Sequence, residues 1–335
     1  MTTLKDIADE TGYSIATISR VLNHDKFFSA TDETRHTILT AAEKLNYINS
    51  NSRTQSAAKK QEKQKQQIKI GLAYWYSASD EINDPYYLSI RLAIENYCEQ
   101  NNIDLKLFCL LEVTDLEIKN AKLDGLIALG KYSEAEIKRL SVLTKNFVLV
   151  DCYTKQYDID VVMVDLKEAT KDLISYLFSL EIKDIGFIGG VEGTLDGTIL
   201  IDNRLKTFLK YEFADSNCIY QGTFNADSGY EIMTDIIKNH QLKKAYIVAS
   251  DAMAFGALKA LNENNIAVPE VVSILSFNNI SMSSFTIPAL TTVDLNTHLV
   301  GTTAAEVMHE RIRSKRTIAK KIFIPTKLIK RESSL

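Results

Sequence analysis

A short segment near the N-terminus combines hydroxyls, small side chains and one arginine in a pattern that could contact a nucleic acid. Ser14 can cap a helix whose apolar side chains recur at i, i+3 and i+4, namely Ile18, Val21 and Leu22. The opposite face of that helix then presents Ile15, Ala16, Ser19 and Arg20. Arginine can read guanine edges, and the hydroxyls of Ser14, Thr17 and Ser19 can bind phosphates. A three-helix module that docks on a protein would show the same pattern, so both interpretations stay open here.

A second group of polar and aromatic residues follows the ends of apolar runs. It consists of Tyr74, Trp75, Tyr76 and Ser77, then Asp151, then Ser250 and Asp251, and finally Asn278 and Asn279. Aromatic rings cover the C–H face of a sugar while carboxylates, amides and an arginine bind its hydroxyls, so this set predicts a site for a neutral polyol. The alternative is structural, because such rings can belong to the core and strand-end Asp and Asn often cap helices.

Motifs for catalysis are incomplete in this sequence. The segment GLIALGKY resembles a phosphate-binding loop up to Lys131, but Tyr132 stands where a magnesium-binding Ser or Thr is required. GFIGGVEG lacks the spacing of a dinucleotide loop, and the five histidines form no ligand pair at helical spacing. We therefore predict a protein that is not an enzyme and that has neither a cofactor nor a metal.

Three short helices must position the N-terminal group. Thr3 and Asp6 have the spacing of a capping box, and Gly12 supplies a left-handed stop for the first helix. Ser29, Thr31 and Asp32 are typical of a helix N-terminus and predict the start of a third helix. Its apolar stripe consists of Ile38, Ala41, Ala42 and Leu45. We expect residues 1–48 to form a small helix-turn-helix domain.

The chain from Ile68 onward alternates apolar runs with amphipathic segments. The runs are IKIGLAYW, DLKLFCLL, GLIALG, FVLVD, IGFIGG, AYIVASD, VSILSF and TTVDL. Nearly continuous apolar strands separated by helices predict an α/β fold with parallel sheets that are covered on both faces. This pattern does not decide between one large sheet and two lobes. In either case ligands bind beyond the carboxyl ends of the strands.

Composition excludes several classes of protein. The chain has 335 residues, 45% of them hydrophobic, and no apolar stretch long enough to span a bilayer, so we expect a cytoplasmic globular protein without disulfides. The net charge of −4 is distributed unevenly along the chain, because residues 1–67 carry 10 Lys and Arg against 8 Asp and Glu. The region 49–67 contains the basic stretch from Arg53 to Lys65 and is interpreted as a basic linker, although a merely solvated tether is equally compatible with it.

Longer segments resemble the lactose/galactose repressor family of transcription regulators. The N-terminal match is TLKDIADETGYSIATISRVLN followed by TDETRHTILTAAEKLNY. In the remainder, NDPYY, IGFIGG, RLKTF, VASDAMAFGALKAL, SILSFNNISMSSFTIPALTTV and IFIPTKLIKR occur in the family's order. The resemblance covers essentially the whole chain and is closest to the evolved beta-galactosidase repressor branch, which implies a galactoside-linked role.

The resemblance implies a two-lobed core like that of periplasmic binding proteins, crossed three times by the chain. The crossings are expected near Val161 to Val164, Thr292 to Asn296 and Ile322 to Pro325. The first lobe would then comprise about 68–161 and 293–322, and the second about 162–292 and 323–335.

Site residues are also implied by the resemblance. Ile15, Ala16 and Arg20 match base-reading positions, Leu4, Ser14, Thr17, Ser19 and Asn23 match positions that orient the helices on DNA, and Asp151, Arg204, Ser250, Asp251 and Asn278 match effector-pocket positions. The family's minor-groove leucine is missing from the linker, which gives basic contacts from Arg53 onward more weight. Ser250 and Asn278 replace a common Asn and a common Asp, so the hydroxyl pattern recognised can differ.

These observations predict a repressor of a galactoside or galactose operon that a sugar effector releases from double-stranded operator DNA. No heptad helix follows the core up to Leu335, which favours a homodimer over a tetramer. Two alternatives remain: a global carbon-control regulator of the same family whose effector is a phosphorylated protein, and a sugar-converting enzyme with a helical appendage.

Overall fold

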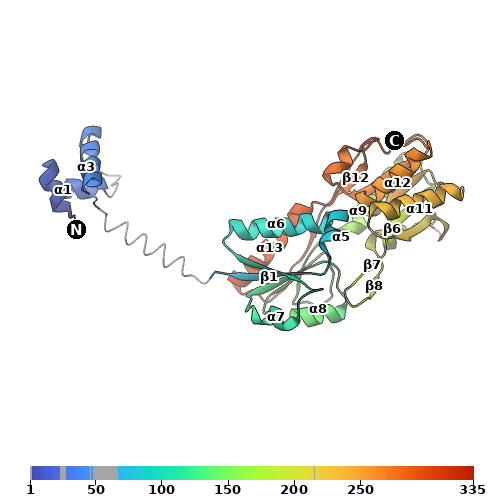
Figure 1. Ribbon diagram of the computed structural model, residues 1–335, viewed down its shortest axis with the longest axis horizontal. Coiled ribbons are helices and arrows are strands. Elements are labelled where there is room, and N and C mark those ends of the chain that lie inside the picture. The colour runs from blue at the N-terminus through green and yellow to red at the C-terminus, as the bar shows by residue number, and fades with distance from the viewer. Residues whose placement is uncertain (1, 23–27, 46, 48–66, 215) are drawn as a thin grey trace. The chain divides into compact units, whose positions relative to one another are not determined.

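A computed structural model describes residues 2–22, 28–45, 47, 67–214 and 216–335. It divides into two compact units, residues 1–67 and residues 68–335 (Figure 1). Most of the predicted basic linker lies outside the described residues, and so do Asn23 and Arg53. Each unit is considered by itself below.

The first unit contains the three predicted helices: α1 (Leu4–Thr11), α2 (Ile15–Leu22) and α3 (Asp32–Lys44). The capping box of Thr3 and Asp6 is present, and Gly12 ends α1 with φ 74°. The Ser14 hydroxyl accepts a hydrogen bond from the Thr17 amide at 3.1 Å, as the sequence predicts for the start of α2. The local signals for all three helices are thus confirmed.

A small apolar core holds these helices together. Its fully buried members are Ile7, Ile18 and Ile38, one from each helix, and Val21 is only 2% exposed. Because the inner stripe of α2 is used for this packing, its other face is left at the surface.

The first sheet of the core has six strands in the order β13-β5-β4-β3-β1-β2, all parallel. The strands are β1 (Lys69–Tyr74), β2 (Asp104–Cys109), β3 (Gly125–Leu129), β4 (Phe147–Val150), β5 (Asp160–Val164) and β13 (Lys321–Ile324). Helices α6 (Tyr86–Gln100) and α13 (Thr297–Ser314) cover one face, and α7 (Asp115–Asn120) and α8 (Glu134–Ser141) cover the other (Figure 1). The short helix α5 (Ala78–Asn83) follows β1. We call this part the first lobe.

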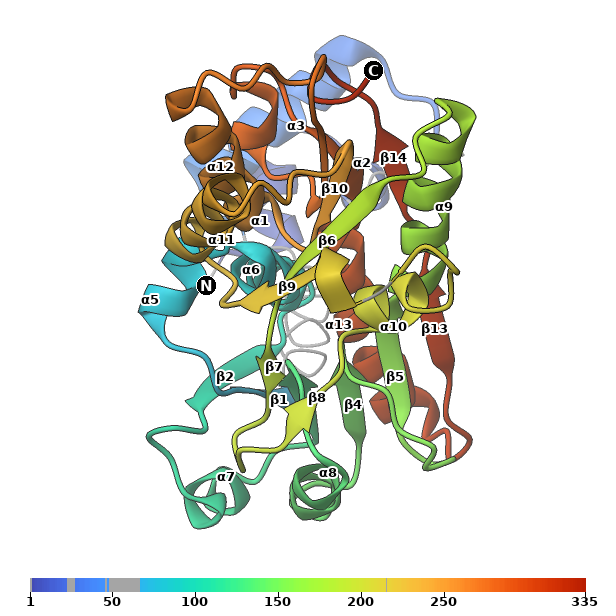
Figure 2. The same cartoon turned by 90° about the vertical axis from the view of Figure 1, so that its right-hand side faces the viewer.

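The second lobe is built around another six-stranded sheet, in the order β14-β12-β11-β10-β6-β9. Its strands are β6 (Ile185–Gly190), β9 (Ile219–Gly222), β10 (Ala245–Val248), β11 (Ser273–Asn278), β12 (Thr291–Asp294) and β14 (Lys327–Ile329), of which only β14 pairs antiparallel within the sheet. Helices α9 (Leu166–Ser179) and α10 (Asn203–Phe208) and helices α11 (Ala226–Lys238) and α12 (Asp251–Glu263) lie on opposite sides of it (Figure 2). A hairpin of β7 (Glu192–Gly193) and β8 (Ile199–Leu200) and two 3₁₀ turns, Ser216–Cys218 and Ser281–Ser284, complete the lobe.

The two-lobed α/β architecture is therefore confirmed, with three crossings between the lobes. They fall between β5 and α9, between β12 and α13, and between β13 and β14. They overlap or directly follow the expected crossings, and they lie slightly later than the expected lobe boundaries at residues 161, 292 and 322. The reason is visible in β5, where Val161 and Val162 are fully buried and pair with both β4 and β13, so this strand stays in the first sheet through Val164.

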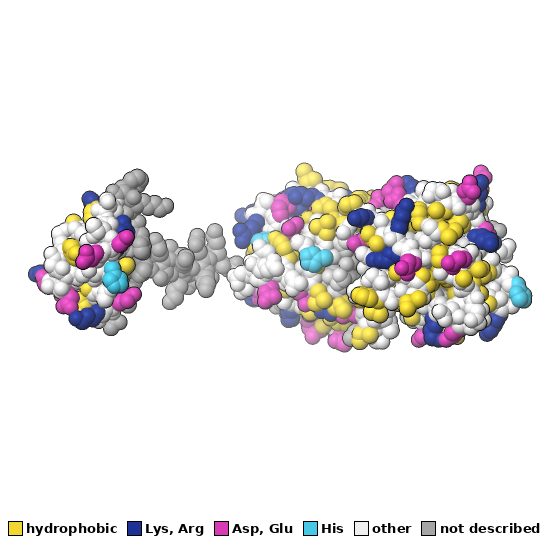
Figure 3. All heavy atoms as spheres, turned by 90° about the horizontal axis from the view of Figure 1, so that it is seen from above, with side chains coloured by type: hydrophobic (Ala, Val, Ile, Leu, Met, Phe, Trp, Pro, Cys, Tyr) yellow, Lys and Arg dark blue, Asp and Glu magenta, His cyan; other side chains and the backbone are white. Residues whose placement is uncertain are grey.

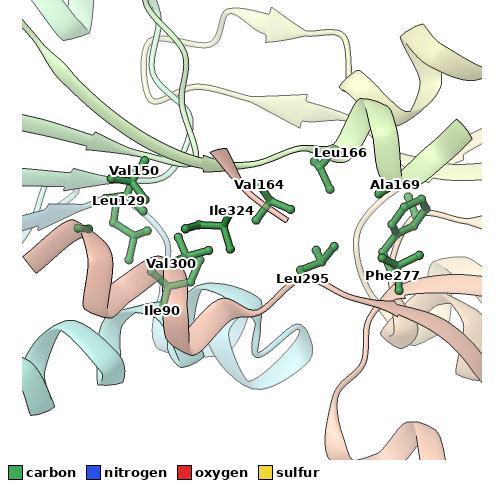
Figure 4. Close-up of a cluster of buried hydrophobic side chains, with 14 of the residues drawn as sticks. Ile90, Leu129, Val150, Val164, Leu166, Ala169, Phe277, Leu295, Val300 and Ile324 are labelled. Atoms are coloured by element: carbon green, nitrogen blue, oxygen red, sulfur yellow. The ribbon is translucent and has the colours of Figure 1, made fainter. Parts of the chain in front are cut away.

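Apolar side chains at the three crossings are buried. Figure 4 shows Val164, Leu166, Leu295 and Ile324 turned toward one another between the lobes, in a cluster that also contains Phe277 of the second lobe. Burial of such side chains contributes about 1.5 to 3 kcal/mol each. The two lobes thus share one apolar cluster where they meet.

None of the helices within the described ranges is long and apolar enough to cross a membrane.

Candidate functional site

A cavity of about 380 Å³ lies between the lobes, at the carboxyl ends of both sheets. Leu166 and Leu295 from the crossing segments lie in its lining. Other lining residues from the first lobe include Trp75, Tyr76, Asp84, Tyr86, Tyr87, Lys131 and Asp151, and those from the second include Glu192, Arg204, Phe224 and Asn278. This volume lies within the range of ordinary small-molecule sites.

Aromatic rings form one wall of the cavity. Tyr76 and Tyr87 stack with their ring centroids 4.8 Å apart, and Tyr86 meets Tyr87 edge-on at 5.0 Å. The indole N–H of Trp75 donates to the Lys131 carbonyl at 2.8 Å, which fixes that ring as well. Rings held in this way present rigid apolar faces to a ligand.

Lys131 and Asp151 form a buried ion pair in the first lobe. The Lys131 Nζ lies 3.0 Å from Asp151 Oδ2 and donates to the Asp151 carbonyl at 2.8 Å. Burial lowers the pKa of Lys131, but the Asp151 and Glu192 carboxylates outweigh this effect and raise its pKa above the ordinary value. The lysine is therefore charged and already paired. Asp151 Oδ2 also accepts a hydrogen bond from the Tyr87 hydroxyl at 2.9 Å.

Arg204 occupies the corresponding place in the second lobe. Its Nε donates to Asp202 Oδ2 at 2.7 Å, its Nη1 donates to the Ala249 carbonyl at 2.5 Å, and its Nη2 lies 3.5 Å from Glu192 Oε1. The guanidinium also lies 5.4 Å from the ring centroid of Phe224. A cation with so many partners supports the cavity wall and has little charge left to offer an anion.

Two further carboxylates have pKa values above their ordinary range. Burial raises the pKa of Asp84 to about 6, although the Tyr86 amide donates to it at 3.2 Å. The Asn278 side chain of the second lobe also donates to Asp84 Oδ1 at 3.2 Å. Burial likewise raises the pKa of Glu192, against the opposing effect of Lys131. Acids therefore outnumber bases in this cavity.

Some buried polar atoms at the cavity lack a well-formed hydrogen bond within the described residues, although the Tyr86 hydroxyl interacts with the Asp151 carboxylate. The hydroxyls of Tyr76 and Tyr86 and Asp151 Oδ1 make no hydrogen bond of ordinary geometry within the described residues. Buried polar groups usually have a partner, so these atoms are available to a ligand. Two hydroxyls and a carboxylate oxygen suit a molecule that is rich in hydroxyl groups.

Five of the ten residues that the sequence analysis names for this site line the cavity: Trp75, Tyr76, Asp151, Arg204 and Asn278. The structure places Tyr74, Ser77, Ser250, Asp251 and Asn279 outside the lining. Ser77 caps α5, and Ser250 caps α12 by accepting from the Met253 amide. Tyr74 is half-buried behind Tyr76, with its ring 6.0 Å from the Arg91 guanidinium.

Asp251 has a structural environment instead. It is fully buried and accepts hydrogen bonds from the Ser276, Ser283 and Thr292 hydroxyls and from the Ile280 amide. These donors come from β11, β12 and the turn after β11, so the carboxylate ties that turn to the sheet. The role of Asp251 is thus structural, although it does not cap a helix, because the N-cap of α12 is Ser250.

Sequence reasoning missed several lining residues, among them Asp84, Tyr86, Tyr87, Lys131, Glu192 and Phe224. Lys131 follows β3 and Glu192 follows β6 at the carboxyl ends, which was the signal available for both. Lys131 was weighed only as part of a phosphate loop. The tyrosines belong to the NDPYY segment, whose position after β1 gave a further indication.

The outer face of α2 is the candidate DNA surface. Ser14, Ala16 and Arg20 are exposed, Ile15 is 49% exposed, and Thr17 and Ser19 are half-buried. The Arg20 guanidinium lies 5.4 Å from the ring centroid of Phe28, at the surface of the unit. Leu4 packs against the apolar core and so supports the helix pair. The groups on this face are those that the sequence predicts for groove contacts.

Comparison with known proteins covers both units. Residues 3–50 match the family model "Bacterial regulatory proteins, lacI family", and residues 174–334 match "Periplasmic binding protein-like domain". The chain is 37% identical to the HTH-type transcriptional regulator GalR of Lacticaseibacillus casei over 100% of both chains. It is 35% identical to the regulator GanR of Bacillus subtilis over 99% of both.

Solved structures agree on the fold. A lac repressor dimer bound to operator and the anti-inducer ONPF superimposes with a TM-score of 0.70 at 22% identity, covering 100% of this chain and 99% of that one. A complex of the regulator CelR with cellobiose gives 0.69 at 20% identity, covering 99% and 100%. The full-length relatives are transcription regulators and not enzymes. With such relatives and a matching helix-turn-helix unit, the chain belongs to the lacI family of bacterial regulatory proteins.

Proposed function

We propose that this regulator is a homodimeric repressor of a galactoside-utilisation operon, and that a neutral galactoside in the interlobe cavity releases it from its operator. The names GalR and GanR of two relatives are consistent with such a role. Arg20, Ile15 and Ala16 would read bases, with Arg53 and its basic neighbours contacting phosphates.

The charge balance of the cavity carries the proposal for the effector. Both cations, Lys131 and Arg204, already have carboxylate partners, and Asp84 and Glu192 add further acidic groups. A phosphate would meet this excess of acids without a free cation, because desolvating an anion beside carboxylates is unfavourable. A neutral sugar instead donates its hydroxyls to the carboxylates and stacks on the rings.

A homodimer is supported by exposed apolar side chains on both lobes. Ile82 of α5 is 80% exposed, Phe285 and Ile287 after the Ser281–Ser284 turn are 75% and 89% exposed, and Met282 is 57% exposed. Figure 3 shows apolar side chains exposed in patches on the core. Such patches mark interfaces, and a two-fold dimer would place two headpieces on the half-sites of one operator.

The free energy that couples sugar binding to operator binding follows from the difference in sugar affinity between the two states. A sugar that binds the DNA-free form about 100-fold better weakens operator binding by about 2.7 kcal/mol, which is within the usual range of coupling energies. The effect requires that the two states of the core hold the headpieces differently.

The test uses the full-length chain and an operator selected from random duplex DNA. The chain has a single tryptophan, Trp75, which lines the cavity, so its fluorescence reports binding directly. We expect galactose, lactose or melibiose to change this emission and to release the operator in gel shifts, and galactose 6-phosphate to do neither. Release by the phosphorylated sugar alone, or by a phosphorylated protein alone, would overturn the proposal.

One variant links the response to the cavity. Tyr86→Phe removes a cavity hydroxyl that makes no hydrogen bond of ordinary geometry within the described residues, so it should change stability little and weaken sugar binding about five- to tenfold. Tyr74→Phe, outside the lining, is the matched control and should bind like the wild type. Equal sugar affinity of Tyr86→Phe and the wild type would place the sugar elsewhere.

A further inference from the structure

The hairpin of residues 192–200, here called the interlobe hairpin, reaches from the second lobe to the first. It follows β6 and precedes α10, so both of its ends belong to the second lobe. Its two strands pair antiparallel with each other and with no other strand of the described chain. Figures 1 and 2 both place it beside α8 of the first lobe.

The turn of this hairpin makes specific contacts with the start of α8. The Asp196 amide donates to Glu136 Oε1 at 2.9 Å, and the Ser133 hydroxyl donates to Asp196 Oδ2 at 2.5 Å. Leu195 packs against the apolar cluster of the first lobe. Ser133 and Glu136 are themselves fixed by the capping box of α8. The two lobes are thus joined by contacts outside the three crossings.

Asp196 is held in position by its own hairpin. Its Oδ1 accepts from the Thr194 hydroxyl at 2.7 Å and from the Thr198 amide at 3.0 Å, and Gly197 has φ 83° in the tight turn. The hydrogen bond from Ser133, followed by those from Thr198 and Thr194, keeps the pKa of Asp196 below its ordinary value. The carboxylate is therefore charged, and its own hairpin holds it in position to accept the hydrogen bond from Ser133 of the first lobe.

The base of the same hairpin lies in the cavity. Glu192 Oε1 is 4.0 Å from Lys131 Nζ of the first lobe and 3.5 Å from Arg204 Nη2 of the second. Glu192 and Gly193 both line the cavity, whereas Asp196 does not. One short element therefore contacts the ligand space at its base and the opposite lobe at its turn.

We propose that the interlobe hairpin holds the lobes closed, and that Asp196 is a positioning residue that raises effector affinity without touching the effector. The hydrogen bonds to Ser133 and Glu136 exist only while the lobes are closed, so their loss favours the open core. Apparent affinity falls in proportion to the population that is competent to bind. The inference rests on the proposed function for the effector, but lobe closure itself is measurable without one.

The first test therefore uses no sugar. Acrylamide quenching of Trp75 in the full-length chain measures access to the cavity, since this is the only tryptophan. Asp196→Ala should increase quenching, and Asp196→Asn, which keeps an acceptor oxygen, should lie between it and the wild type. Asp235→Ala, which removes an exposed carboxylate on α11, should quench like the wild type. Unchanged quenching in Asp196→Ala contradicts the proposal whatever the effector is.

The second test uses lactose and a matched pair of helix-cap variants. Ser133→Ala removes the hydroxyl that caps α8 and donates to Asp196, whereas Thr114→Ala removes the equivalent cap of α7. We expect Ser133→Ala and Asp196→Ala each to weaken lactose binding about fivefold, mainly through faster dissociation, with Thr114→Ala unaffected. The double variant Ser133→Ala/Asp196→Ala should bind lactose nearly as well as either single variant, because both substitutions remove the same hydrogen bond.

The two proposals fail differently. If the wild type binds lactose and all variants bind it equally, the hairpin has no positioning role while the effector proposal stands. If the wild type binds none of the galactosides, the effector proposal fails, and acrylamide quenching still decides whether the hairpin closes the lobes.

Discussion

Arg20 is the side chain on which sequence-specific DNA recognition depends most. It is exposed on α2, beside the exposed Ile15 and Ala16, and its guanidinium has five donors in a fixed geometry. Arg20→Ala should weaken operator binding by about 1 to 3 kcal/mol and leave binding to random DNA almost unchanged. Fluorescence anisotropy with both duplexes measures the difference. Lys5→Ala, at another exposed position of the headpiece, serves as control. An equal loss on both duplexes would assign Arg20 to a phosphate.

Asp84 gives the protein a predictable pH dependence. Burial raises its pKa from 3.8 to about 6, so between about pH 4 and pH 6 the folded protein binds more protons here than the unfolded chain. This group therefore stabilises the fold at low pH and loses that contribution as pH rises through 6. Asp84→Asn removes the cost of ionisation, so the variant should be about 3 kcal/mol more stable than wild type at neutral pH.

Urea unfolding of both proteins at about pH 4.5 and about pH 7.5 tests the direction of this effect. The advantage of Asp84→Asn should shrink toward the lower pH, where the wild-type carboxyl is protonated. Asp227→Asn, an exposed site at the start of α11, is the control and should show no such trend. If the difference in unfolding free energy between Asp84→Asn and the wild type instead widened as pH falls, the Asp84 carboxylate would be stabilised by its neighbours.

At the scale of the element, Asp251 shows how one carboxylate holds a turn on a sheet. Four donors from β11, β12 and the turn at Ser281–Ser284 converge on it. Asp251→Ala would leave all of them unpaired inside the second lobe, so we expect a loss of about 3 kcal/mol or more in unfolding free energy. Chemical denaturation with a Trp75 readout measures this. A variant of normal stability that merely fails to bind sugar would show that Asp251 belongs to the effector site.

The sequence predicted elements better than the directions of single side chains. Capping boxes, Gly12 and apolar runs are local signals, and they located the three headpiece helices and the strands β1 to β4, β6 and β10 to β12, whereas the buried run of β5 was not singled out. Whether a polar residue at a strand end faces a cavity or caps the next helix depends on packing that is remote in sequence. For this reason Asp151 lies in the cavity lining while Ser250 and Asp251, in a similar context, do not.

The number of lobes also required information beyond local pattern. Periodicity gives the same apolar runs for one sheet or two, and the strand order is set by pairings such as β13 with β5, more than 150 residues apart in the chain. The short strands β9 and β14 carry mixed burial and no strong apolar run, so they gave no signal. Family resemblance supplied the two lobes, and the structure moved the crossings by a few residues.

At the scale of the whole molecule, DNA binding depends on how two chains meet. An operator with two half-sites binds a dimer far more tightly than a monomer, because the second headpiece binds at a high effective concentration. Exposed apolar residues at the Ser281–Ser284 turn and on α5 are the candidates for that contact. A charged residue there should separate the chains at little cost to the fold.

Phe285 offers the sharpest test, since it is 75% exposed and its replacement disturbs no core packing. Phe285→Glu should yield a monomer in light scattering after gel filtration, because burying its carboxylate in an apolar interface is unfavourable. Operator affinity should fall at least about tenfold, whereas sugar binding, which uses residues of one chain, should persist. Ile318→Glu alters a residue that is 74% exposed in the loop before β13 and should remain dimeric. If Phe285→Glu stays dimeric and Ile318→Glu does not, the chains meet through the first lobe near Ile318 instead.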